Sequence, residues 1–322
     1  MLTLILNKNS KSYDISDLVE TVTWKGRKGA AARSLSVTLA DTDKASSGID
    51  VTRGDSLVFH EDGSELFRGI VMTSQRADSR KETVTAYDNG IYLANNKDTF
   101  VFNNKTVHDV FIDVCKRFGV RVGSAASTSY KIPELVKKSS TAWDVLLDAV
   151  SQDFKATGNK YYISSEKGLL YLRKRTENIL QYVLETGGNI TSYSLKSSIE
   201  KINTRIKVLT KEDTVYAVEK NTELEKKIGI FQDIESKDDD LTDAQLKAQI
   251  KEHLKEKSTP EEALSVTALG VSDVISGVGV WAKIDPLNIA RTYWVDEDSH
   301  TWQGDVHTMT LKLDKNNGVD KK

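Results

Sequence analysis

The chain has 322 residues, of which 39% are hydrophobic and 29% charged, and its formal net charge is −2 at pH 7. A chain of this length predicts about two domains, or three, with enough buried surface to fold without cross-links. The near balance of 45 basic and 47 acidic residues argues against a general nucleic-acid binder, because that class shows a clear basic excess.

The single cysteine, Cys115, excludes an internal disulfide, so the fold must depend on packing. Residues 1–6 are apolar, but they lack the basic start and the length of a secretory signal. No stretch approaches the ~20 consecutive apolar residues of a membrane span. We therefore expect a soluble protein that is made in the cytoplasm and does not itself bind a membrane.

The first hundred residues predict a β domain. Turn formers such as Glu61-Asp62-Gly63 and Asp88-Asn89-Gly90 separate short runs of strand-favouring residues. Polar and apolar residues alternate at 34–38 and 82–86, as in a half-buried sheet. The runs are residues 2–6, 21–24, 35–39, 56–59, 66–72 and 83–87. Short strands at this spacing are typical of a small barrel or sandwich.

Two amphipathic helices follow. The first, residues 107–118, starts after Thr106 as its N-cap and stops before Gly119; the second starts after Thr141 and ends near Gly158. The first apolar stripe consists of Val107, Val110, Phe111, Val114, Cys115 and Phe118; the second consists of Trp143, Leu146, Leu147, Val150 and Phe154. The two helix starts are similar, which indicates either an internal duplication or the same cap chemistry used twice. With a hairpin at residues 160–174, they predict an inserted α/β domain.

Strands return in the second half of the chain. We expect them at residues 191–195, 202–209, 214–218, 262–269, 280–284, 293–297 and 306–313. Residues 241–257 predict one added helix with a thin stripe of Leu246, Ile250 and Leu254. We interpret the acidic run Asp238-Asp239-Asp240 as charge at the N-terminus of that helix rather than a metal site.

No catalytic motif is recognised. The sequence contains no Gly-x-Ser-x-Gly elbow, no Walker loop and no Gly-x-Gly-x-x-Gly. The glycines between residues 270 and 279 lie between strands, so we interpret them as a connection and not as a phosphate cradle. Cys115 falls on an apolar helix stripe and predicts a buried, inert thiol. The tryptophans are scattered, which favours core or interface positions over a sugar-binding platform.

The closing strands, residues 293–313, contain the sharpest site candidate. Asp296, Asp298 and His300 would share one face of an extended strand, and two carboxylates with an imidazole can hold a divalent cation. The alternative is a hairpin with turn residues near Asp298-Ser299 and at Gln303-Gly304-Asp305, and with histidines bonded to the backbone. In the alternation of the last strand, His307 falls on the same face as Met309, Leu311 and Leu313, which should face the core. This position favours the alternative. We predict no catalytic, cofactor or metal site.

Several segments resemble the baseplate hub family of phage tails. They are residues 84–96, 106–119, 161–173 and, most specifically, the closing His300-Thr301-Trp302 with His307-Thr308-Met309. The chain is similar to PBSX-type prophage tail proteins, which are related to the late control D protein and to the hubs of contractile tails. The resemblance covers nearly the whole chain, except residues 219–257.

The resemblance implies a structural hub subunit that forms a homotrimer. Each chain would supply two tube-forming β-barrel domains, so that three chains match a six-fold tail tube to a three-fold spike. The implied partners are the tail spike, the tail tube or its initiator, the tape-measure protein, and a baseplate wedge or LysM-type tail protein. No specific nucleic-acid binding is implied. The particle is a phage tail or an R-type bacteriocin, made in the host cytoplasm.

We therefore expect a β-rich α+β protein with a first barrel domain at 1–100, an α/β domain at 101–176 and a second barrel domain at 177–322. We expect a structural protein of a contractile particle and not an enzyme. Two other functions stay open: a peptidoglycan hydrolase or peptidase, and a carbohydrate- or receptor-binding tail module.

Overall fold

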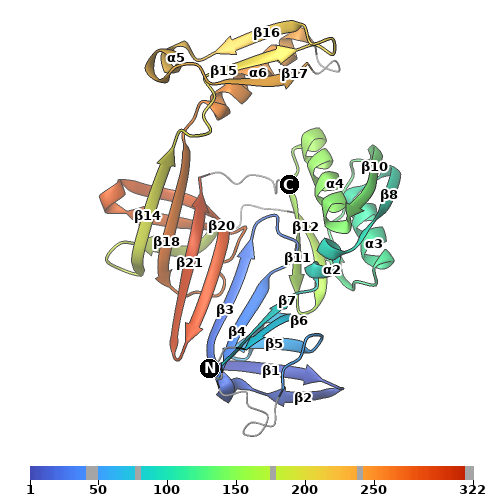
Figure 1. The fold of residues 1–322 in the computed structure, drawn as a ribbon, viewed down its shortest axis with the longest axis vertical. Coiled ribbons are helices and arrows are strands. Elements are labelled where there is room, and N and C mark those ends of the chain that lie inside the picture. Colours follow the sequence, from blue (N-terminus) through green and yellow to red (C-terminus); the bar gives the residue numbers. More distant parts are fainter. Residues whose placement is uncertain (41–49, 77–80, 175–178, 238–241, 316–322) are drawn as a thin grey trace. The chain divides into compact units, whose positions relative to one another are not determined.

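A computed structural model describes residues 1–40, 50–76, 81–174, 179–237 and 242–315 (Figure 1). The protein is β-rich with few helices, as expected from the sequence. It divides into two compact units: Met1–Tyr193 with Ser265–Lys322, and the inserted Ser194–Leu264. The acidic run Asp238-Asp239-Asp240 lies outside the described residues.

The N-terminal β region follows the predicted strands closely. Its elements are β1 (Leu2–Lys8), β2 (Lys11–Asp14), the 3-10 turn η1 (Ser16–Leu18), β3 (Val19–Arg27), β4 (Ser34–Leu39), β5 (Ser56–Glu61), β6 (Ser64–Arg76) and β7 (Glu82–Tyr87). Because side chains alternate along a strand, every second side chain lies on the buried face of the sheet. This buried face includes Leu4, Val22, Leu35, Val37, Phe59, Val84 and Ala86. The short strand β2, with four exposed residues, was not predicted because it lacks an apolar face.

The α/β segment is packed around both predicted helices. Its elements are α2 (Gly90–Asn95), β8 (Lys97–Lys105), α3 (Val107–Arg117), β9 (Val122–Ala125), β10 (Ile132–Thr141), α4 (Ala142–Thr157), β11 (Tyr161–Glu166) and β12 (Leu169–Lys174). Thr106 and Thr141 cap α3 and α4 as predicted, and Gly158 ends α4 with a φ of 74°. Cys115 is buried among the helix contacts, as predicted, and this burial raises the pKa of its thiol to about 12.

The remaining strands of the first unit complete one large sheet. They are β13 (Ile179–Glu185), β14 (Ile190–Ser198), β18 (Glu261–Leu269), β19 (Gly279–Ile284) and, after the 3-10 turn η2 (Asp285–Leu287), β20 (Ile289–Gln303) and β21 (Val306–Asp314). The sheet has the order β14-β18-β21-β20-β3-β4-β7-β6-β5-β1-β2, with β13 and β19 branching from β20 (Figure 1). The pairing of β3 with β20 connects the strands from the N-terminal part of the chain with those from its C-terminal part.

The two halves of this sheet share one topology. Strands β13, β14, β18, β19, β20 and β21 repeat the chain order and the neighbours of β1, β3, β4, β5, β6 and β7. The long strands β6 and β20 both pair with one neighbour through their first half and with another through their second half. The halves differ at one pairing, since β1 is antiparallel to β5 whereas β13 is parallel to β19.

The second unit is a three-stranded sheet covered by a helix. Its elements are β15 (Arg205–Leu209), β16 (Val215–Lys220), α5 (Thr222–Ile228), β17 (Gln232–Ser236) and α6 (Asp243–Lys257). The predicted stripe Leu246, Ile250 and Leu254 is buried against Ile206 and Val208. Lys257 adds ion pairs to Asp233 at 2.5 Å and Glu235 at 2.8 Å on β17. The helix α5 and the strand β17 were not predicted.

The closing hairpin has one feature that corrects the prediction. β20 does not turn near Asp298-Ser299, because it continues to Gln303, and the chain reverses at Gly304 and Asp305. Pairing with β3 on one side and β21 on the other keeps Asp298 and Ser299 extended. A register shift between Val295 and Glu297 instead forms a β-bulge at Asp296.

Candidate functional site

The candidate residues of the closing hairpin lie where β20 pairs with β3, which we call the seam. Along the seam, Asp298 is opposite Gly26, His300 is opposite Trp24, and Trp302 is opposite Val22. Asp298, His300 and Trp302 alternate with exposed or half-buried residues and all point into the protein. The seam therefore buries polar side chains at the point where the two halves of the sheet meet.

An ion pair between Arg33 and Asp298 spans the seam. Both guanidinium nitrogens Nη1 and Nη2 donate to the Asp298 carboxylate, Nη1 at 3.0 Å, and the Ser276 N–H donates to the same carboxylate at 2.7 Å. The Asp298 side chain has no exposed surface and that of Arg33 is 17% exposed. A bidentate pair with this geometry is strongly directional, so it sets the position of β20 relative to the β3–β4 connection.

Neighbouring residues keep the Arg33 side chain in place. Its guanidinium carbon lies 4.0 Å from the centre of the Trp24 ring. At Gly26, a Cβ atom would come within 1.8 Å of Arg33 Nη1, so a larger residue there would displace the guanidinium from Asp298. The Arg33 N–H donates to Asp88 at 3.1 Å, and burial raises the pKa of the Asp88 carboxyl to about 7.

A second chain of polar contacts runs through the two histidines. His300 Nε2 lies 3.0 Å from the Val274 carbonyl oxygen, and His300 Nδ1 lies 3.0 Å from His307 Nε2. Because a carbonyl oxygen only accepts, the proton of neutral His300 is on Nε2 and His307 donates from its own Nε2. In this tautomer His307 Nδ1 carries no proton, so its 3.4 Å approach to Glu61 Oε1 is a contact and not a hydrogen bond.

Glu61 connects this chain to β5. Its carboxylate accepts from Trp302 Nε1 at 2.7 Å and from the Ser272 hydroxyl. The His307 and Trp302 rings are stacked with centroids 4.1 Å apart. At Gly270, a Cβ atom would lie 2.1 Å from the His307 ring, which explains a glycine at this end of the loop after β18. These contacts join β5, β20, β21 and the 270–278 loop.

The buried histidines favour the neutral state. Burial lowers the pKa of His300 to about 4, although the nearby Asp298 carboxylate acts in the opposite direction. Burial also lowers the pKa of His307, against the attraction of Glu61. The unfolded chain therefore takes up protons at these positions before the folded chain does as the pH falls.

The candidate metal ligands are each engaged by other groups, although His300 Nε2 lies 3.7 Å from Asp298 Oδ2. Asp296 lies at the bulge, Asp298 is held by Arg33, and His300 is held by Val274 and His307. Within the described ranges, no three His, Cys, Asp or Glu side chains form a group suited to a metal ion. The alternative of histidines bonded to the backbone is confirmed for His300. His307 was expected to face the core, and its side chain bonds to that of His300.

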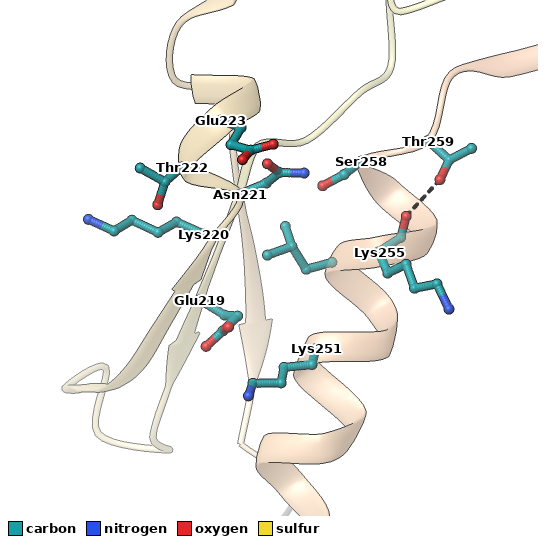
Figure 2. Close-up of a pocket in the computed structure, with 10 residues that line it drawn as sticks. Glu219, Lys220, Asn221, Thr222, Glu223, Lys251, Lys255, Ser258 and Thr259 are labelled. Atoms are coloured by element: carbon teal, nitrogen blue, oxygen red, sulfur yellow. Dashed lines mark hydrogen bonds between the residues drawn. The ribbon is translucent and has the colours of Figure 1, made fainter. Parts of the chain in front are cut away.

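The second unit has a hollow of about 470 Å³ between β16, α5 and α6 (Figure 2). Glu219 and Lys220 line it from β16, and Lys251 and Lys255 line it from α6. Figure 2 shows Lys220 and Lys255 directed to opposite sides, whereas Lys251 extends from α6 toward the side on which Glu219 lies. Their mixed charge points to no particular ligand.

Sequence reasoning missed most of the seam partners. Arg33 is 265 positions from Asp298, and Glu61 is 241 positions from Trp302, so no local pattern connects them. The serines of the 270–279 loop, Ser272 and Ser276, were interpreted only as part of a connection. Four tryptophans are buried, in agreement with the predicted core or interface positions, and the fifth, Trp281, is 43% exposed, so an interface position for it stays a prediction. No helix in the described part of the chain has the length and apolar character needed to cross a membrane.

The fold is that of tail proteins. The 43 kDa tail protein of prophage MuSo2 from Shewanella oneidensis matches 99% of this chain and 100% of its own, with a TM-score of 0.75 and 14% identity. The Escherichia coli protein c3393, a type VI secretion component described as similar to the T4 tail proteins gp27 and gp5, matches 92% of this chain and 73% of its own, with a TM-score of 0.58 and 10% identity.

Sequence comparison is more specific. The phage-like element PBSX protein XkdQ of Bacillus subtilis (strain 168) is 33% identical over 321 residues, covering 98% of both chains. The YQBQ-like family matches residues 22–314. The chain belongs to the YQBQ-like family, which confirms the resemblance found in the sequence.

The ion pair across the seam predicts a large and non-additive loss of stability. Removing one charge leaves the other buried without a partner, so Arg33→Gln and Asp298→Asn should each lower the free energy of unfolding by about 3–5 kcal/mol. The double variant should lose about 2 kcal/mol less than the sum, as measured by urea unfolding. Arg27→Gln, which removes an exposed pair with Glu297, should cost less than about 1 kcal/mol. Additive losses would contradict the coupling.

The neutral His300 predicts a pH dependence. Its contribution to stability is complete above a pH of about 6.5, the unfolded pKa, and is lost as the pH falls to about 4. The stability difference between the wild type and His300→Gln should therefore shrink by about 3 kcal/mol between pH 7 and pH 4. Urea unfolding at several pH values measures this difference. Parallel curves for the two proteins would contradict a neutral His300.

Proposed function

We propose that the chain is a structural baseplate hub subunit of a contractile phage tail or phage-tail-like particle. In this role it forms a trimeric ring that adapts a six-fold tail tube to a three-fold spike. Membership in the YQBQ-like family and the names of the relatives, a phage-like element protein and a prophage tail protein, support a place in the tail. The similarity of a type VI secretion component with the same fold to two T4 tail proteins supports the hub position.

The observation that carries the proposal is the repeated topology of the large sheet. Strands β3, β4, β7 and β6 form one four-stranded set, and β14, β18, β21 and β20 form an equivalent set beside it. Three chains would bring six such sets together, one for each subunit of a six-fold tube. The ring as a whole would keep three-fold symmetry, as a three-fold spike requires.

The seam predicts how the ring closes. Within one chain, the second half of β20 pairs with β3. By the equivalence of the halves, the second half of β6, residues 71–76, would pair with β14 of the next protomer. Residues 72–76 and 191–197 are exposed, including the apolar side chains of Met72, Tyr193 and Leu195. Pairing these edges would cover them and turn the open sheets of three chains into one barrel.

In this proposal the barrel domains, residues 1–100 and 177–322, are completed only in the ring. The domain at 101–176 and residues 199–260, which lie between β14 and β18, are insertions that leave the strand pairings unchanged. An obligate ring interface of this kind buries on the order of 2,000 Å² or more. The proposed neighbours are the tail spike, the tail tube or its initiator, the tape-measure protein, and a wedge or LysM-type protein.

We propose a structural role rather than an enzymatic one. Two of the candidate metal ligands of the closing hairpin, Asp298 and His300, have no exposed side-chain surface. Each is bonded to groups that fix the β strands in position. Their hydrogen bonds and ion pair therefore stabilise the seam, on which the proposed ring geometry depends.

The proposed edge predicts an assembly defect. Met72→Glu places a charge at the β6 edge and should weaken trimer formation at least tenfold, about 1.4 kcal/mol, because burying an unpaired charge is unfavourable. Tyr13→Glu on β2 is the matched control, since Tyr13 is 39% and Met72 40% exposed. Light scattering, with spike or tube partner added if needed, should give a trimer for the wild type and the control. A wild-type chain that is always monomeric would refute the proposal.

A further inference from the structure

The three-stranded sheet of the second unit has one face under α6 and one face that α6 leaves uncovered. Ile206 and Val208 of β15 lie on the covered face, under the apolar stripe of α6. On the uncovered face, which we call the open face, register partners form three rows across β16, β15 and β17. The rows are Lys220–Arg205–Gln232, Val218–Lys207–Ile234 and Val215–Leu209–Ser236.

Apolar side chains are exposed together on the open face. Val215, Val218 and Ile234 are 56%, 46% and 57% exposed, and Leu209 is half-buried beside Val215. Ile230 precedes β17 with the same alternation as Ile234, and it is 61% exposed. A contiguous apolar surface of this kind marks an interaction site, whereas single exposed apolar residues need no explanation.

The pairing pattern of the sheet also favours cover on both faces. β15 and β17 run parallel, and parallel strands are found mainly in sheets whose two faces are both covered. The helix α6 supplies this cover for one face. We therefore expect the layer over the open face to come from a partner.

The charges on the open face are all basic. Its three rows contain Arg205, Lys207 and Lys220, and no Asp or Glu. Arg205 is already paired with Glu225 of α5 at 2.8 Å. Lys207 is half-buried in the middle row, and it forms no ion pair with any side chain that the structure describes. A carboxylate brought by a partner would supply the missing counter-charge.

We propose that the open face is a docking site for an acidic amphipathic helix of another protein. The apolar stripe of that helix packs on Val215, Val218 and Ile234, and a carboxylate beside the stripe pairs with Lys207. Strands of five or six residues are about 17–20 Å long, and three of them are about 14 Å across, which matches about three turns of one helix. The surface lies within the second unit, so the inference goes beyond the proposed ring and does not depend on it.

Two other occupants fit the open face less well. A second copy of the chain that packed by the same face would bring basic rows against basic rows, and like charges across an interface are unfavourable. An anionic membrane surface is recognised by clusters of about four to eight basic residues, whereas the open face has Arg205, Lys207 and Lys220, of which Arg205 is paired.

The chemistry is tested by binding of two synthetic helical peptides to the full chain. Both peptides have a leucine stripe about three turns long, flanked by glutamate in one and by lysine at the same positions in the other. In fluorescence anisotropy, the wild type should bind the glutamate peptide about tenfold more tightly, because Lys207 attracts one peptide and repels the other. In Lys207→Glu the preference should reverse, and binding of the lysine peptide shows that this variant is folded.

A matched control makes the same charge change elsewhere in the unit. Lys247→Glu, on the exposed side of α6, should keep the preference of the wild type. Ile234→Asp should lose the glutamate peptide, because it replaces an apolar contact with a like charge. Equal binding of both peptides by the wild type, or an unchanged preference in Lys207→Glu, would overturn the proposal. Peptide binding by a chain that never forms a trimer would refute the proposed ring and leave the docking surface in place.

The natural occupant is tested in purified particles. A photoreactive benzophenone amino acid in place of Ile234 should form an adduct with a different protein. Mass spectrometry of that adduct should identify a segment with apolar residues at helical spacing and with Asp or Glu beside them. An adduct with another copy of this chain, with lipid or with a segment that lacks carboxylates would overturn the proposal, as would the absence of any adduct.

Discussion

The pairing of β3 with β20 is the constraint on which the rest of the molecule depends. It joins strands from the two ends of the chain and makes one sheet from two similar halves. Arg33 and Asp298 hold this seam with a buried bidentate pair, and Glu61, His300 and His307 extend the polar contacts to β5 and β21. A buried ion pair adds little net stability over an apolar contact, but it tolerates few alternative arrangements. The seam therefore contributes mainly by setting the register between the halves.

Local features of the fold were predictable from the sequence. Helix caps at Thr106 and Thr141, the stripe of α6 and the pairing of the last two strands all depend on residues close together in the chain. The seam was not predictable, because its partners lie more than 200 positions apart and only the fold brings them together. The expected turn at Asp298-Ser299 was wrong for the same reason. Turn-forming residues stay extended when strands pair with them on both sides.

The repeated topology gives a physical reason for the proposed hub. Each half-sheet has an edge that pairs within the chain at the seam, and an equivalent edge that stays open at β14 or β6. A protein with one internal and one open copy of the same junction can form a closed ring with twice as many similar units as chains. In chain order, the proposed domain at 101–176 lies between β7 and β13, and residues 199–260 lie between β14 and β18, so neither interrupts these strands.

A cryo-EM map of the assembled ring tests the central claim most directly. We predict three chains in which residues 71–76 of one protomer pair with β14 of the next, in the manner of β20 and β3 within a chain. A ring whose protomers meet through other surfaces, with both of these strand edges unpaired, would contradict the account.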